Sequence, residues 1–552
     1  MKKKLRVGLL VDDLQLPAWA IKMVKQIHHS DYAEMVLVIQ KTNPQPAPKS
    51  FLYNLINLRS GKFYYLFEQF ENRIFKPTPN AFQTSDLREV VDCRVMEVTV
   101  EEIKYSDHFS TSDIENIQSH EIDVLIRIGF RTLRGDILNC AKYGVWSYHH
   151  GDHMVNRGGP AGVWEVLEDW DETGVTLHIL TEDLLGGNIL YKTSGFTDGL
   201  SINRSRNNYF WKAASFLPRK LEELYKLGES SFFEQVETDN ADPLFYYNRL
   251  YTLPTNAEIF KIILKKYLEA MKRKVSNLFY FDQWILLYKF ENNQEVSNSF
   301  YDFKRITPPK DRFWADPFII EKNQRYYIFM EELLFQEQKG KISVITLDEE
   351  GNYDSPVVVL DKPYHLSYPL LLEEEGALYM LPETSDNGTI EIYKCVDFPY
   401  KWDLHKVLMT DIRAVDTTIL KHDNKYWMFT NILVEEVNDG VGELFLFYAD
   451  DLFSDHWTPH PMNPLSTDIK TARPAGNILL HKNKMYRISQ NCQNRYGYGM
   501  NTFEITQLDE QVYQEKLVQS IYPNWAKDVI ATHTLNHHKN LTIIDAELRR
   551  RK

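Results

Sequence analysis

The chain has 552 residues, 43% of them hydrophobic and 25% charged, and this length predicts two or three domains because one ordinary core cannot take it up. The net charge is −14 and the basic clusters are confined to the two ends, which argues against nucleic acid, transfer RNA included, as a partner. Four widely spaced cysteines, no signal-peptide pattern and no long apolar run predict no metal site, no disulfide framework, no membrane span and a cytoplasmic location.

The N-terminal part predicts the start of an α/β domain. Residues 4–11 predict a short apolar strand, residues 18–27 have helical spacing, and residues 35–40 predict a second strand. This βαβ order indicates a parallel sheet covered by helices. The first strand is not followed by the Gly-x-Gly fingerprint, which argues against a nicotinamide cofactor. Residues 44–79, rich in Pro, Asn and aromatic residues, are interpreted as an insertion.

The next segment carries the candidate catalytic residues of this domain. Residues 124–128 predict a strand, residues 132–141 a helix, and the residues up to His149 a further strand. Side chains at the carboxyl end of such a parallel strand face the crevice in which α/β folds bind ligands. In the following loop Arg157 and Gly158 are candidate substrate-binding residues, since glycine lets a backbone approach an anionic or sugar ligand. A plain turn is the alternative.

This segment resembles the formyltransferase domain shared by methionyl-tRNA, glycinamide ribonucleotide and sugar N-formyltransferases. The matching residues are Tyr143, Gly144, His149, Arg157, Gly158, Pro160, Gly174, Val175, Thr176, His178, Gly186, Gly187, Ile189 and Leu190. The resemblance implies a mostly parallel α/β fold, an amino sugar or sugar nucleotide as substrate, and 10-formyltetrahydrofolate as cofactor.

In that family a histidine, an asparagine two residues before it and an aspartate at a later turn act together. Here His149 matches the histidine, but Ser147 and Leu185 stand at the other two positions. Either the reaction is lost or nearby polar residues rebuild the site, namely His150, Asp152 and Asp183. Asp152 could pair with His149 as acid and base, and Ser147 could donate to an oxyanion or act as a nucleophile. Ordinary turn or hydrogen-bonding roles are the alternative for each.

Three regions follow from these patterns. Residues 1–205 are expected to form the formyltransferase-like α/β domain, residues 206–279 a helical linker, and residues 280–552 an all-β five-bladed propeller. The linker is predicted from helical spacing at 207–227 and 258–278, and its lysines are interpreted as a solvated face.

The propeller is predicted from an internal repeat of two short strands around a polar turn. The turns centre on Asn323, Glu375, Asp423, Lys482 and His538. Their spacings of 52, 48, 59 and 56 residues suit a four-stranded blade. The strand-like residues 281–289 could complete the last blade and close the ring, which removes unpaired edges.

Polar residues recur where the innermost strands begin and the second strands end, and we expect them at the mouth of the central channel. The first set is Asp316, Tyr368, Asp416, Arg473 and His533, and the second is Glu331, Glu383, Asn431 and Gln490. Such a mouth suits a polyol. Asp316, Glu383, Asp416, Arg473 and Gln490 are the candidate substrate-binding residues.

The strings FWADPF, HLSYP, MLPE, VDTTI and ARPAG look like the propeller at the N-terminus of plant glucosamine inositolphosphorylceramide transferases. More distantly, Asp316 and Asp416 are similar to two carboxylates of five-bladed glycoside hydrolases, of which the first is a general base. A hydrolase would also need a general acid, for which Glu383 and Glu331 are candidates. Binding of backbone amides within the channel is the alternative role for both aspartates.

Three hypotheses therefore compete. The preferred one is a formyltransferase-like enzyme that modifies an amino sugar or glycan precursor recognised by the propeller. The second is a glycoside hydrolase or transglycosidase built on Asp316, Asp416 and Glu383, and the third is a non-catalytic glycan-binding scaffold. The identity of the sugar, the donor and the oligomeric state do not follow from the sequence.

Overall fold

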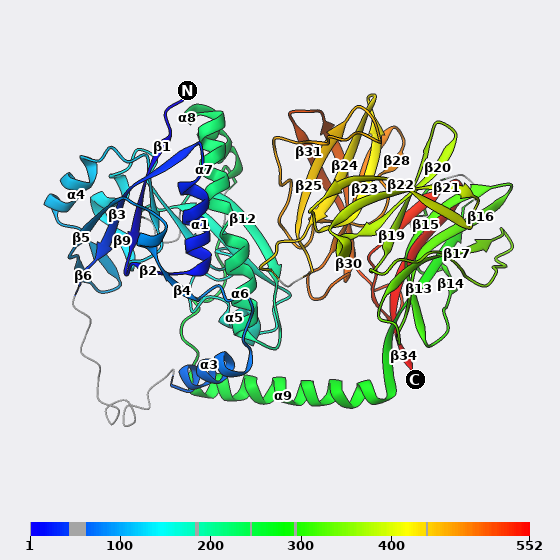
Figure 1. Cartoon of the computed structure of the whole chain (residues 1–552). Helices are drawn as coiled ribbons and strands as arrows, with labels where there is room; N and C mark the ends of the chain where they lie inside the picture. Colours follow the sequence, from blue (N-terminus) through cyan, green and yellow to red (C-terminus); the bar gives the residue numbers. More distant parts are fainter. Residues whose placement is uncertain are drawn as a thin grey trace. The chain divides into compact units, whose positions relative to one another are not determined.

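A computed structural model shows two compact units, Met1–Tyr267 and Leu268–Lys552, which are described one at a time (Figure 1). The described residues are 2–43, 62–182, 187–242, 245–291, 295–297, 299–437 and 440–552. The expected insertion lies partly, and Asp183, Leu185 and Gly186 lie wholly, outside these residues. The predicted three-part boundaries stay a prediction.

The first unit is built on a seven-stranded sheet in the order β12-β11-β10-β8-β1-β3-β5. Its strands are β1 (Leu5–Val11), β3 (Ala33–Lys41), β5 (Arg94–Val98), β8 (Val124–Arg127), β10 (Val145–His149), β11 (Glu172–Ile179) and β12 (Ile189–Phe196). The five strands from β10 to β5 run parallel, and β11 and β12 run antiparallel to their neighbours. The mixed α/β class with a largely parallel sheet is confirmed.

Helices surround this sheet. They are α1 (Ala18–His28), α3 (Lys62–Ile74), α4 (Thr111–Gln118), α5 (Val163–Leu167), α6 (Ile202–Ala213), α7 (Phe216–Leu227), α8 (Glu229–Asp239) and the first part of α9 (Asn256–Phe279). In α1 the apolar residues recur every three or four positions and are buried, while Lys25 and His28 are exposed, as expected for a helix that covers a sheet. The remaining short strands are β2 (Gln15–Pro17), β4 (Thr84–Asp86), β6 (Glu101–Ile103), β7 (Ser106–His108) and β9 (Thr132–Arg134).

The predicted helix at residues 132–141 is wrong. The chain there forms β9, which pairs in parallel with β7, and then a short 3-10 segment, Gly135–Asn139. Gly135 adopts a left-handed conformation with φ of 78°, which an α-helix cannot contain. The apolar spacing is satisfied instead by burial of Leu133 and Ile137 in one core cluster.

The second unit consists mainly of β-strands, and its described residues form five successive antiparallel sheets. Their orders are β14-β13-β34-β32, β15-β16-β17-β18, β19-β20-β21-β22, β23-β24-β25-β26 and β27-β29-β30-β31. The second, third and fourth of these sheets consist of β15 (Arg312–Lys322), β16 (Arg325–Leu334), β17 (Gly340–Leu347), β18 (Val357–Leu360), β19 (Ser367–Glu374), β20 (Ala377–Thr384), β21 (Thr389–Asp397), β22 (Lys401–Thr410), β23 (Ala414–His422), β24 (Lys425–Ile432), β25 (Glu443–Ala449) and β26 (Thr458–Pro459). The others are β13 (Tyr280–Phe290), β14 (Lys304–Ile306), β27 (Arg473–Pro474), β28 (Leu479–His481), β29 (Lys484–Asn491), β30 (Gly499–Leu508), β31 (Tyr513–Ile521), β32 (Val529–Ala531), β33 (Leu535–His538) and β34 (Leu541–Arg551).

The predicted turns lie between neighbouring strands of the five sheets, namely between β15 and β16, β19 and β20, β23 and β24, β28 and β29, and β33 and β34. Left-handed residues mark them, at Asn323, Glu375, Asp423, Lys482 and Lys539. The predicted strand at 281–289 is β13, which pairs with β34 from Tyr280 opposite Arg551 to Phe290 opposite Leu541. One sheet therefore joins the first and last strands of the unit, so neither is an unpaired edge.

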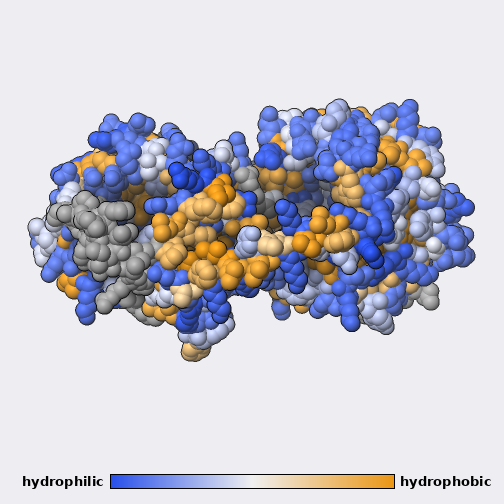
Figure 2. Space-filling view, turned by 90° about the horizontal axis from the view of Figure 1, so that it is seen from below, coloured by the Kyte–Doolittle hydropathy of each residue, from blue (hydrophilic) through white to orange (hydrophobic). Residues whose placement is uncertain are grey.

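The outer side of α9 is unusual for a helix of a folded domain. Large apolar side chains along it are exposed, and Figure 2 shows apolar side chains gathered over α3 and α9. No helix among the described residues is both long and apolar enough to cross a bilayer.

The pairing of β13 with β34 predicts where the second unit is most sensitive to truncation of a side chain. Ile544 is fully buried in the core of this sheet, so Ile544→Ala should lower the free energy of unfolding by about 2–5 kcal/mol in urea titrations. Arg551→Ala, at the exposed end of the same strand, is the control and should change it by less than about 0.5 kcal/mol. Equal effects of the two variants would contradict the packing of β34.

Candidate functional site

The second unit contains a cluster of buried charged residues that starts from three strained positions. Asp316, Tyr368 and Asp416 lie near the starts of β15, β19 and β23 with φ of 50°, 46° and 50°. At each position the register with the next strand shifts, as in a β-bulge. A left-handed conformation is uncommon for these residue types, and the bulge turns the side chain out of the ordinary alternation of the strand.

Asp416 is the centre of the cluster. Its Oδ2 accepts hydrogen bonds from Nε of Arg473 and, at 2.8 Å, from Nε2 of Gln490. The Arg473 guanidinium also donates to the carbonyl of Gly440 at 2.6 Å and lies 4.9 Å from the centre of the Tyr496 ring. The three predicted residues Asp416, Arg473 and Gln490 are thus brought together, and the buried negative charge is compensated.

Glu383, a predicted site residue that lies on β20, is next to the Asp416–Arg473 pair. Its Oε2 accepts from the backbone N–H of Asp416 at 3.4 Å and is 3.8 Å from Nη2 of Arg473. Burial is the main cause that raises the pKa of Glu383 to about 8, and the charge of Asp416 is the second; the charge of Arg473 acts in the opposite direction. At neutral pH Glu383 therefore carries a proton that it can donate.

Glu331, on β16, and His365, just before β19, form a second pair. Oε1 of Glu331 lies 3.1 Å from Nε2 of His365, whose Nδ1 accepts from the backbone N–H of Gly340 at 2.9 Å. Burial lowers the pKa of His365, but the bond and charge of Glu331 outweigh it and raise the pKa to about 9. Protonation of the ring would cost the bond from Gly340, because a protonated Nδ1 can only donate, so with this bond the ring is neutral and its Nε2–H donates to Glu331.

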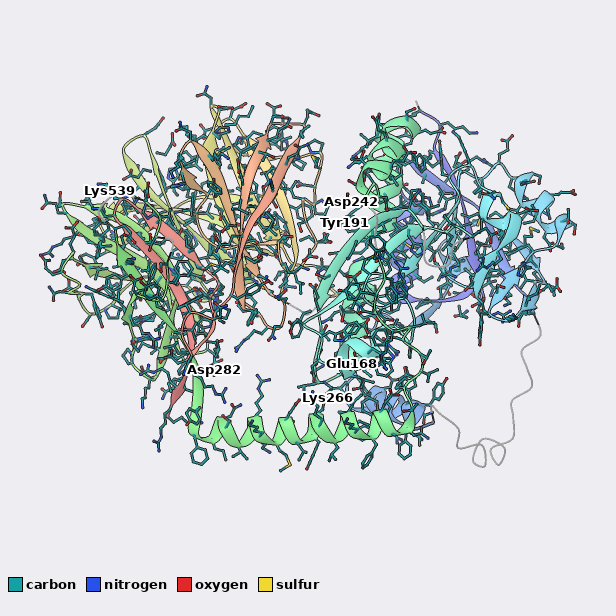
Figure 3. The ribbon with its side chains drawn as sticks, turned by 180° about the vertical axis from the view of Figure 1, so that it is seen from behind. Glu168, Tyr191, Asp242, Lys266, Asp282 and Lys539 are labelled. Atoms are coloured by element: carbon teal, nitrogen blue, oxygen red, sulfur yellow. The ribbon has the colours of Figure 1, made fainter. Side chains whose placement is uncertain are left out.

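Asp316 belongs to a third group, held by the sheet of β13 and β34, which runs between Asp282 and Lys539 in Figure 3. Its backbone N–H donates to Asp545 Oδ2 at 3.2 Å, and its Oδ1 accepts from the Thr534 hydroxyl at 2.6 Å. His533 Nδ1 lies 2.6 Å from Asp545 Oδ2 and 3.9 Å from Asp316 Oδ1.

The charges of this third group are interdependent. Burial lowers the pKa of His533, but Asp545 outweighs it and raises the pKa to about 9. Burial raises the pKa of Asp316 to about 7, with the His533 cation acting against it. The His533 ring also stacks on Trp284, with centroids 4.1 Å apart. Asp316 can therefore exchange a proton near neutral pH.

These residues also include the possible metal ligands. One ligand atom each of Asp316, His533 and Asp545 lies within 4.8 Å of the others, and no other such group occurs among the described residues. A metal would need a neutral histidine, whereas the bond to Asp545 favours the protonated ring. The imidazolium itself fits the space between the two carboxylates, so the arrangement suits proton transfer better than metal binding.

In the first unit, Ser147 and His149 lie at the carboxyl end of β10, as predicted. Ser147 Oγ accepts from Nε of Arg127 at 2.9 Å. His149 Nε2 is 2.6 Å from the carbonyl of Asn156, so Nε2 carries the proton and Nδ1 keeps a lone pair. Burial lowers the pKa of His149, and the ring is therefore neutral.

The other predicted residues of the first unit have partners within the fold. Asp152 pairs with Lys192 at 2.8 Å and accepts from the Met154 N–H, so its two oxygens are engaged by these partners. His150 stacks on Phe210 with centroids 3.7 Å apart, and its buried Nδ1 has no hydrogen-bond partner among the described residues.

Contacts with other residues of the first unit fix the loop that contains Arg157 and Gly158. Arg157 Nε donates to the carbonyl of His153 at 2.8 Å, and its guanidinium lies 4.7 Å from the Tyr246 ring centre. A Cβ on Gly158 would come within 1.8 Å of the Tyr251 carbonyl oxygen. The close approach that this glycine permits is thus to the chain itself.

Sequence reasoning missed Asp545, Thr534 and Trp284. One signal was available for Asp545: it interrupts the apolar run of β34, where a charged residue needs a buried partner. Thr534 and Trp284 carry no such signal, because their roles depend on pairing between the two ends of the unit.

The His533–Asp545 pair predicts a pH dependence of stability. The pKa of His533 rises from 6.5 to about 9 on folding, so the pair stabilises fully below about pH 6.5 and is lost as the pH rises towards 9. Circular dichroism should show that the melting temperature falls less between about pH 6.5 and 9 in His533→Gln than in the wild type. His481→Gln, in the same unit, is the control and should behave as wild type. An unchanged pH dependence in His533→Gln would contradict the ion pair.

Comparison with known proteins adds to this picture. Residues 304–546 match the family model described as "Glucosamine inositolphosphorylceramide transferase 1, N-terminal". A protein named glucosamine inositolphosphorylceramide transferase 1, from Oryza sativa subsp. japonica, is 28% identical over 206 residues, which are 37% of this chain. The match spans only 27% of the length of that curated relative, about a quarter.

Two solved structures are also similar. GH43B of the xyloglucan PUL of Bacteroides ovatus has 12% identity and a TM-score of 0.31, covering 44% of this chain and 53% of its own. Glycinamide ribonucleotide transformylase 1 from Symbiobacterium toebii has 14% identity and a TM-score of 0.27, covering 40% of this chain and 88% of its own. The curated relatives carry names of sugar-lipid transferases and give no support to the predicted formyl transfer. What the comparisons show is that the second unit resembles the N-terminal part of those transferases.

Proposed function

We propose that the chain is a carbohydrate-directed transferase whose second unit holds one sugar of a glycan or glycolipid at the carboxylate cluster. The similarity over residues 304–546 supports this, since that range contains every charged residue of the cluster. The names of the relatives point to glucosamine and to inositolphosphorylceramide as the substrate class. The five sheets would be the blades of a five-bladed propeller, with the cluster at its channel.

The observation that carries the proposal is a protonated carboxyl group beside an ion pair within one cluster. Burial and the charge of Asp416 keep Glu383 protonated at neutral pH, and Asp416 accepts hydrogen bonds from Arg473 and Gln490. A raised pKa of this kind is typical of a general acid. Asp316, with its pKa of about 7, is the further carboxyl group that can exchange a proton.

The chemistry would be transfer of a glycosyl group. An acceptor hydroxyl oxygen bonds to the anomeric carbon, and the bond from that carbon to the leaving oxygen breaks. Glu383 gives its proton to the leaving oxygen, and ionised Asp316 takes the proton of the hydroxyl. If water replaces the acceptor, the same groups perform hydrolysis, which is the alternative reaction.

A ligand would reach the cluster from the side on which its residues are partly exposed. Tyr496 is 43% exposed and can stack on the apolar face of a sugar ring. Glu383 lies beneath, since its side chain is 13% exposed.

Replacement of Glu383 tests the proposed acid. With inositolphosphorylceramide-type acceptors and glucosamine donors, Glu383→Gln should lower turnover about 10²–10⁴-fold, because the amide cannot give up a proton. Wild-type turnover should fall as the pH rises above about 8, where Glu383 ionises. Glu375→Gln, in the exposed turn of the same sheet, is the control and should keep full turnover in the same mass-spectrometric assay.

The outcomes separate the competing functions. Full turnover by Glu383→Gln would exclude Glu383 as the acid. Product without an acceptor alcohol would indicate hydrolysis. Binding of the glycan by calorimetry, together with no turnover by the wild type on any tested donor, would indicate a non-catalytic scaffold.

A second candidate function, formyl transfer in the first unit, is favoured by the neutral ring of His149. Its Nδ1 lone pair can accept a proton from an amine, and Ser147 lies two residues before it. The cofactor would be 10-formyltetrahydrofolate.

Folate binding tests this second candidate directly. Titration of the chain with a stable 10-formyltetrahydrofolate analogue should release heat, and His149→Ala should bind with altered affinity. His28→Ala, an exposed histidine of α1, is the control and should bind as wild type. The absence of any heat of binding in the wild type would remove formyl transfer.

A further inference from the structure

Two helices of the first unit expose an apolar face. In α3 the exposed large apolar residues are Phe63, Tyr65, Leu66, Phe70 and Ile74. In the part of α9 that belongs to this unit they are Phe260, Leu264 and Tyr267. Spacings of three and four residues place most of them on one side of each helix.

The opposite sides of the two helices hold them together. Tyr64 of α3 and Ile259 of α9 are buried in one core cluster, and the Phe63 N–H donates to Asn256 Oδ1 at 3.2 Å. Lys266 lies on the side of α9 nearer Glu168 in Figure 3, and its Nζ is 2.5 Å from Asp169 Oδ1. The exposed apolar residues are therefore those that the core of the unit does not use.

Basic residues predominate around this face; on α9, Glu258 pairs with Arg249 and Glu269 is an exposed acid just beyond Tyr267. The acids of α3 turn inward: Glu71 is buried, and Glu68 pairs with Arg206 at 2.6 Å. Exposed basic residues stand next to the apolar ones along the chain, namely Arg73, Lys76 and Lys261. A basic rim around an apolar face is notable in a chain whose net charge is −14.

We propose that this α3–α9 face, made of the exposed apolar residues above and their basic neighbours, docks on a lipid leaflet that contains anionic headgroups. Figure 2 shows apolar side chains gathered over these helices. An amphipathic helix with lysines beside its apolar stripe lies in the interface, with the apolar side chains among the acyl chains and the lysines at the headgroups. The face is a place of contact with a membrane surface, and it does not require a spanning segment.

The charge pattern favours a lipid surface over a second copy of the chain. Two copies joined through this face would bring lysines and arginines towards one another, and like charges across an interface are unfavourable. Anionic headgroups instead neutralise them. Within the second unit, the rest of α9 repeats the pattern by itself, with exposed Leu268, Met271, Val275 and Leu278 and with exposed Lys272 and Lys274.

Vesicle flotation with the full chain tests the proposal without any sugar substrate, so the result is independent of the proposed transfer reaction. The wild type should float with vesicles of a roughly 7:3 mixture of phosphatidylcholine and phosphatidylserine, more weakly with phosphatidylcholine alone, and less at high salt. The variant Leu66→Asn/Phe70→Asn/Leu264→Asn should bind more than about tenfold less, because three apolar side chains no longer enter the leaflet.

Charge reversal separates the electrostatic contribution. Lys261→Glu should lower binding to the mixed vesicles about fivefold or more and leave binding to phosphatidylcholine alone nearly unchanged. The matched controls lie elsewhere on the first unit: Tyr105→Asn is an exposed apolar residue in another turn, and Lys25→Glu is an exposed lysine of α1. Both controls should bind as wild type, and all variants should keep the wild-type melting temperature.

Two results would overturn the proposal. One is a wild type that stays with the soluble fraction at low salt, or a triple variant that binds as wild type. The other is self-association of the wild type in sedimentation equilibrium without vesicles that the triple variant abolishes, since the face would then join copies of the chain.

Discussion

The second unit depends on polar contacts among its innermost strands. A bulge leaves backbone groups without their strand partner, and buried groups of this kind need other partners. Tyr368, which lies at one bulge, is such a partner. Its hydroxyl accepts from the Gly476 N–H at 2.6 Å and lies 2.8 Å from the Thr418 hydroxyl. Asn536 donates to the carbonyl of Pro317 at 2.8 Å, next to another bulge. The same irregular positions present Asp316 and Asp416, so the cluster cannot be separated from the packing that supports it.

The pKa of a buried histidine depends on whether a carboxylate lies within bonding distance, and His460 of the second unit, whose pKa burial lowers, behaves like the histidines of the first. In the first unit, burial lowers the pKa of four histidines, His149, His150, His153 and His178. In the second, a carboxylate within bonding distance outweighs the same burial at His365 and His533. The first unit therefore offers neutral proton acceptors, whereas in the second unit His365 and His533 are each held by a carboxylate.

Local patterns were sufficient for most of the fold. The apolar runs of β1, β3 and β8 and the periodic residues of α1 were predictable because strands and covering helices show their burial in short windows. The repeat singled out Asp416, Arg473 and Gln490, which do contact one another, since its period marks equivalent positions in successive sheets. The 132–141 segment was wrong because Gly135 takes a left-handed conformation that apolar spacing does not reveal. Thr534 was missed because its role depends on a contact with a residue 218 positions away in the chain.

The pairing of β13 with β34 has a consequence for biosynthesis. β13 begins the second unit, yet its main partner is the last strand, and eleven residues of each are opposed from Tyr280 to Phe290. As the chain leaves the ribosome, the intervening sheets can form while β13 still has an open side. The pairing of β13 is complete only when residues up to Arg551 have emerged, so its open side has to be kept from pairing with other chains until synthesis has passed this point.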